Sequence, residues 1–81
     1  MNLYCRLMKC DATSAEYAVG SYSNQLTGLA RFFSDERMPE ILIPWEESES
    51  HARYKLCCTY WKYEECLKSG IFPGKMSREI G

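Results

Sequence analysis

Residues 45–68 read WEESESHARYKLCCTYWKYEECLK, and this stretch decides the fold because it predicts a long amphipathic helix. At about 100° per residue, five of its apolar side chains fall within one arc of roughly 80°. The five are Ala52, Leu56, Tyr60, Tyr63 and Leu67. An arc of this width is typical of a helix face that packs on a core. We therefore expect one helix over residues 48–69, with this stripe facing a sheet.

The two ends of the predicted helix carry recognisable signals. Ser48 suits the N-cap position, and Glu49 follows in the first turn, where the helix dipole favours a negative charge. Gly70 suits the position just after the last turn, and Pro73 forbids further helix. These residues bound the helix on both sides.

A second apolar stripe lies on the far side of the same helix. It consists of Tyr54, Cys57, Cys58 and Trp61. A surface helix needs only one apolar face, so another group must cover the second one. The covering can come from the chain itself, either from its end through Ile71, Phe72, Met76 and Ile80 or from a helical segment 13–34. It can also come from a partner protein or from a second copy of the chain.

Two further segments predict strands. Residues 2–10 alternate partly between apolar and polar side chains. Residues 40–45 form a short apolar run flanked by Pro39 and Pro44, and the prolines favour an edge position in a sheet or the ends of a strand.

Residues 13–34 are compatible with two structures. Apolar residues at helical spacing and the capping-box spacing of Thr13 and Glu16 favour a helix over 14–33. Against it, six Gly, Ser, Asn and Thr residues in the interior would cost a helix about 4 kcal/mol relative to alanine. The alternative is a hairpin of strands 16–22 and 28–34, joined by a turn-rich loop, and we favour it.

These segments predict an α+β fold in which a small antiparallel sheet of three to four strands is covered by the one long helix. If residues 14–33 are helical, the order becomes β-α-β-α. The 81 residues make a single domain over 1–81. We expect residues 71–81 to be a tail with a short helical turn at 76–80.

The charge is close to balanced but uneven along the chain. The net charge is −1, which argues against a general nucleic-acid binder. Residues 35–50 carry six acidic groups against Arg37, a net of −5, and residues 51–81 carry six basic groups against three acidic ones, a net of +3. The basic half 51–81 therefore supports an alternative function as a nucleic-acid-binding accessory protein.

The five cysteines predict free thiols rather than a disulfide framework. Their number is odd, and residues 1–10 lack the apolar run of a secretory signal, so we expect a reducing, cytoplasmic setting without a membrane span. Cysteine and histidine spacings do not match a zinc site, and His51 lies about 10 Å along the helix from Cys58. We predict no metal, no cofactor and no enzymatic activity.

The function that these features favour is a small protein-binding module, an inhibitor or adaptor that blocks a partner protein sterically. Compact inhibitors of host enzymes and defence complexes, such as those of phages and mobile elements, are typical of this size. The predicted partner-binding residues are Tyr54, Cys57, Cys58, Trp61, Lys62 and Glu65, with rim charges at Glu46, Glu47 and Glu49. A second copy of the chain is an alternative partner, and the protein would then form a homodimer through the same face.

Overall fold

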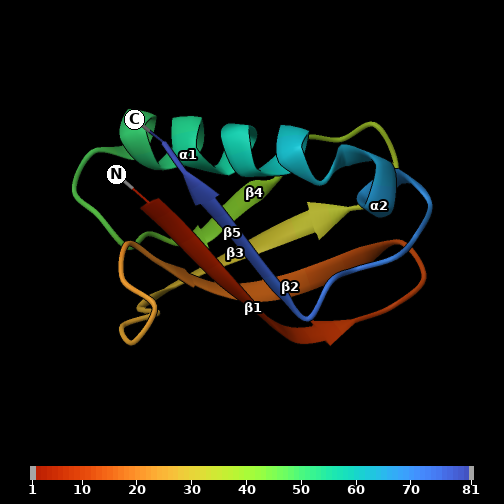
Figure 1. Cartoon of the computed structure of the whole chain (residues 1–81), viewed down its shortest axis with the longest axis horizontal. Coiled ribbons are helices and arrows are strands. Elements are labelled where there is room, and N and C mark those ends of the chain that lie inside the picture. The colour runs from red at the N-terminus through yellow and green to blue at the C-terminus, as the bar shows by residue number, and fades with distance from the viewer. Residues whose placement is uncertain (1, 81) are drawn as a thin grey trace.

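Five antiparallel strands form one sheet, in the order β4-β3-β2-β1-β5, and the helices lie over one of its faces (Figure 1). The structure is a computed structural model that describes residues 2–80. The elements are β1 (Asn2–Cys10), β2 (Ser14–Gly20), β3 (Gly28–Phe33), β4 (Glu40–Ile43), α1 (Glu49–Lys62), α2 (Glu64–Lys68) and β5 (Lys75–Glu79). The α+β prediction is confirmed. The sheet has five strands rather than the three to four expected.

Residues 13–34, for which the sequence allowed either a helix or a hairpin, form the β2–β3 hairpin. The alternative prediction of a helix over 14–33 is therefore wrong. Tyr17 and Phe32 lie on the helix-facing side of the hairpin, where their rings meet edge to face at a centroid distance of 5.3 Å. The loop between the strands folds back so closely that a Cβ atom at Gly20 would collide with the carbonyl oxygen of Gln25. Gly28 likewise lies against Trp45, with 2.7 Å between its ideal Cβ position and the indole ring. These glycines, which argue against a helix, are what the hairpin requires.

The predicted long helix is two helices, broken at Tyr63, whose φ is −110° and ψ 15°. Residues 49–68 contain neither glycine nor proline, so no local signal marks the break. The cause is tertiary: the Tyr63 hydroxyl accepts a hydrogen bond from the Ser77 N–H at 3.1 Å and donates one to the Ser77 carbonyl at 3.3 Å. The Lys62 ammonium donates to the same carbonyl at 2.8 Å.

The expected tail is largely the fifth strand. Residues 75–79 pair antiparallel with β1, so the helical turn predicted at 76–80 is wrong. Only Met76 of this strand is buried, and a five-residue edge strand with one apolar side chain gives almost no alternation to recognise. Before it, the Tyr17 hydroxyl donates to the Pro73 carbonyl at 2.6 Å and fixes the approach of the segment.

The core lies between the sheet and α1. α1 contributes Ala52, Leu56 and Tyr60, and α2 contributes Leu67, all buried, while Tyr63 between the two helices packs at the margin. The core-facing stripe is therefore confirmed. So are β1 over its full predicted length and the edge position of β4. None of the helices in residues 2–80 combines the length and apolar character needed to cross a bilayer.

Candidate functional site

The candidate site is the face of α1 that points away from the sheet. Tyr54 and Trp61 are 55% and 60% exposed there, and Cys57 lies half-buried between them. Together with Glu49, Ser50 and Arg53 they line an open hollow of about 600 Å³. The structure thus brings three of the four residues of the second stripe together on the surface.

The helical repeat sets the geometry of this face. Tyr54 and Trp61 are seven residues apart, which is two turns and about 10 Å along the axis, with Cys57 at the intervening turn. Ala52, Leu56 and Tyr60 occupy the opposite side and hold it against the sheet. The exposed face is therefore carried by a rigid element, which favours a preorganised contact surface.

Some of the charged groups predicted for this site are held by other residues, and others are exposed. Arg53 pairs with Glu49 at 2.9 Å, and Lys62 is bonded to β5. Glu47 and Glu65 are exposed. Two predicted site residues do not lie on this surface: Cys58 is buried, and the Glu46 carboxylate is bonded to Lys55 at 2.7 Å.

Residues 71–80 leave Trp61 60% exposed. Met76 and Ile80, which were candidates to fold over the second stripe, are buried where β5 joins β1. Ile71 is 61% exposed, and Phe72 packs at the margin of the core. Within residues 2–80 the fold buries Cys58 of the second stripe, but it leaves Tyr54 and Trp61 more than half exposed.

The five cysteines are free thiols in different environments. Cys5 is buried in β1, and burial raises the pKa of its thiol to about 12. Cys57 is half-buried on α1, where burial is the main cause of a raised pKa. Cys10 and Cys66 are exposed. Residues 2–80 contain no group of three or more His, Cys, Asp or Glu side chains placed to hold a metal ion.

These environments predict the order in which the thiols react with iodoacetamide at pH 8. Cys10 and Cys66 should be alkylated first, and Cys5 last, because a pKa of about 12 leaves about one thiolate in ten thousand at that pH. Peptide mass spectrometry over a time course measures the order. Labelling of Cys5 as fast as Cys66 in the folded protein would show that β1 and β5 separate readily, contrary to this structure.

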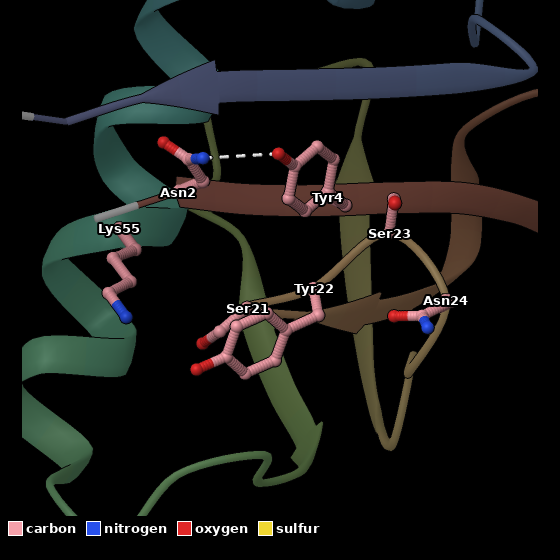
Figure 2. A pocket seen from close by; sticks show the side chains of 7 residues that line it. All are labelled: Asn2, Tyr4, Ser21, Tyr22, Ser23, Asn24 and Lys55. Atoms are coloured by element: carbon pink, nitrogen blue, oxygen red, sulfur yellow. Dashed lines mark hydrogen bonds between the residues drawn. The ribbon is translucent and has the colours of Figure 1, made fainter.

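Sequence reasoning missed a buried charge on α1. Lys55 is 5% exposed and lies on the core side of the helix, one residue before Leu56. The signal was available, because position 55 falls three residues after Ala52 and so near the same arc. Its ammonium points into a hollow at the end of the sheet, toward the hydroxyl ends of Ser21 and Tyr22 (Figure 2).

The basic residues of 51–81 do not gather into one surface. Lys55 is buried against Glu46, and Arg53 and Lys68 are paired with Glu49 and Glu64. Lys75 and Arg78 project to opposite sides of the sheet, because they lie across from Arg6 and Leu3 of β1. Three of the six basic groups of this half are therefore paired with carboxylates of the same chain.

Comparison with known proteins adds no relative. No protein-family model, no curated protein and no solved structure matches the chain. What this protein binds is therefore inferred from its own residues.

Proposed function

We propose that the protein is a protein-binding module whose exposed α1 face, formed by Tyr54, Cys57 and Trp61, docks on a partner protein and blocks it sterically. The observation that carries this proposal is that two large aromatic side chains are more than half exposed on one rigid helix face. Tyr and Trp are the residues in which binding hot spots are enriched. Monomeric proteins seldom expose such a contiguous apolar face without a use for it.

The free energy available from covering this face is substantial. Fully burying two such aromatics removes about 150–250 Å² each from water, worth about 25 cal/mol per Å². Since Tyr54 and Trp61 are already partly buried, covering the rest returns about 4–7 kcal/mol before the costs of association. This gain is enough to make the two side chains the anchors of an interface.

The shape of the face indicates the kind of partner surface. Side chains at positions i, i+3 and i+7 of one helix match an apolar groove that accepts a helix. The Glu49–Arg53 ion pair makes the rim polar at one end of the hollow. Lys62 and Glu65, which follow Trp61 in the sequence and are exposed, are the charges that we propose for the other end. An apolar centre with a polar rim is the usual anatomy of a specific interface.

Replacing Trp61 with alanine should leave the fold intact and weaken partner binding at least 30-fold, the effect of losing a hot-spot residue of about 2 kcal/mol. The fold is spared because the side chain is 60% exposed and makes no hydrogen bond in the described structure. Affinity capture from the native host, quantified by mass spectrometry, identifies the partner. Titration with the purified partner then measures the loss.

The matched control is Ile71→Ala, which removes a side chain of similar exposure that lies after α2, outside the hollow. This variant should retain the partner. Light scattering on the free protein tests self-association through the same face. If Trp61→Ala unfolds the chain, or if both variants lose the partner equally, the α1 face is not the binding surface.

A further inference from the structure

A second, chemically different site lies at the β1 end of the sheet. Two hollows, of about 440 and 270 Å³, lie beside each other there and share Tyr4 and Ser23 as lining residues. The first opens toward α1, and the second lies on the sheet face that Arg6 and Lys75 share. The first is further lined by Asn2, Ser21, Tyr22, Asn24 and Lys55, and the second by Cys5, Arg6, Leu26, Lys75, Met76 and Ser77. No carboxylate lines either of them.

The arrangement of Arg6 and Lys75 is unfavourable for the free protein. They are direct cross-strand partners at the end of the β1–β5 ladder, so their side chains emerge side by side on the same face. In the structure of residues 2–80 neither forms an ion pair, whereas Lys9, Arg31, Arg37, Arg53, Lys55 and Lys68 all do. Like charges at such positions destabilise a sheet, and local conflicts of this kind concentrate at functional sites.

Tyr4 stands next to this pair of cations. It precedes Arg6 by two residues, so both project from the same face of β1. The Asn2 side-chain amide donates to the Tyr4 hydroxyl at 3.1 Å, which orients the ring (Figure 2). Tyr4 and Arg6 pair with Gly20 and Ala18 of β2. Glycine has no side chain and alanine only a methyl group, so this part of the sheet face is not filled by β2 side chains.

The loop between β2 and β3 supplies the other wall. Close packing of Gln25 and Leu26 on Gly20 brings Ser23 and Leu26 beside Tyr4 and Arg6. The Tyr22 ring is 65% exposed and points across the first hollow toward α1 (Figure 2). Two tyrosines, two unpaired cations, and several hydroxyls and amides therefore line one continuous stretch of surface.

We propose that this stretch binds a nucleotide unit, with its phosphate between Arg6 and Lys75 and its base against Tyr4, beside Tyr22. Aromatic side chains on a sheet face stack bases, and adjacent Lys and Arg side chains hold the backbone of single strands. The hydroxyls and amides of Ser21, Ser23 and Asn24 then face the sugar and the base edge. The unit can come from a single-stranded nucleic acid or from a free nucleotide, and the same contacts serve both.

Fluorescence polarisation with a labelled hexauridylate, read at several salt concentrations, tests the site. We expect a dissociation constant of about 10⁻⁴ to 10⁻⁶ M at low salt. Contact with one phosphate predicts a slope of about −0.7 in log K against log salt, and Arg6→Gln should make this slope shallower. Tyr4→Leu and Tyr22→Leu should each weaken binding about fivefold or more without changing the slope.

Arg78→Gln is the matched control, because it removes one positive charge from the same strand on the helix-facing side. It should leave the affinity unchanged. Arg6→Gln should also raise the midpoint of thermal unfolding by about 1–5 °C, because it relieves the like-charge pair. A purely structural role for Arg6 would lower that midpoint instead.

Competition by AMP and by inorganic phosphate distinguishes the sources. If AMP displaces the probe as effectively as unlabelled hexauridylate does, the site binds a free nucleotide. If AMP displaces the probe much more weakly than hexauridylate does, the site binds a single strand. Three results would overturn the proposal: no binding at 20 mM salt, equal losses for Arg6→Gln and Arg78→Gln, or displacement by inorganic phosphate as effective as by AMP.

Discussion

Replacing Glu46 with alanine should lower the free energy of unfolding by about 3 kcal/mol, far more than is usual for a residue between elements. The Glu46 carboxylate is the only group within 4.0 Å that balances the Lys55 ammonium in the structure of residues 2–80, at 2.7 Å. Removing one partner of a buried pair leaves an uncompensated charge, which costs about 3–5 kcal/mol. The lower end applies because the Glu46 side chain is 20% exposed. Urea unfolding followed by circular dichroism measures the change.

Two further variants separate the charge effect from other causes. Glu47→Ala changes the neighbouring, exposed carboxylate and should shift stability by less than about 0.5 kcal/mol. The double variant Glu46→Leu with Lys55→Met removes both charges and should recover most of the loss. If Glu46→Ala costs no more than Glu47→Ala, the pair contributes nothing to the fold.

Replacing Phe32 with alanine should lower the free energy of unfolding by about 4 kcal/mol. Phe32 is fully buried, and its ring meets Tyr17 edge to face at the centre of the sheet. Truncating a buried Phe costs about 3–5 kcal/mol, from lost transfer free energy and the cavity left behind. Urea unfolding measures this loss of stability. The denaturant slope m checks that the native state stays compact.

The matched control for Phe32→Ala is Tyr22→Ala, in the loop of the same hairpin. Tyr22 is 65% exposed, so its loss should stay within about 0.5 kcal/mol. Comparable losses in the two variants would mean that the β2–β3 hairpin does not form the centre of the core.

The sequence was most informative where several signals agreed. The helix was predictable because its capping residue, its apolar arc and its stop signals all pointed to one segment, and Ser48 does cap it. The hairpin was predictable from the helix-breaking residues between Gly20 and Gly28, whose structural reason is close packing against Gln25 and Trp45. In both cases the local preferences and the final fold are consistent.

The features that the sequence did not reveal depend on contacts between distant residues. β5 is held by pairing with β1 and by hydrogen bonds from Lys62 and Tyr63, none of which leaves a local pattern. The same bonds accompany the break at Tyr63. The burial of Lys55 likewise depends on Glu46, nine residues earlier.

The candidate site was predicted in part. Tyr54, Cys57 and Trp61 form one exposed face, as the helical spacing indicated, whereas Cys58 and Glu46 are taken up by the fold. A helical wheel places Cys58 near Tyr54 but cannot show that Cys58 is buried in the folded protein. Whether a residue at the edge of a helical stripe is exposed or buried can therefore be decided only from the structure.

Site-specific photo-cross-linking with benzoylphenylalanine at position 61 in the native host tests whether the exposed α1 face binds a partner protein. The same substitution at Ile71, which is equally exposed, is the control. We expect an adduct with one and the same partner protein from positions 61 and 54, and none from position 71. Equal adducts from positions 61 and 71, or an adduct only with a second copy of this chain, would contradict it.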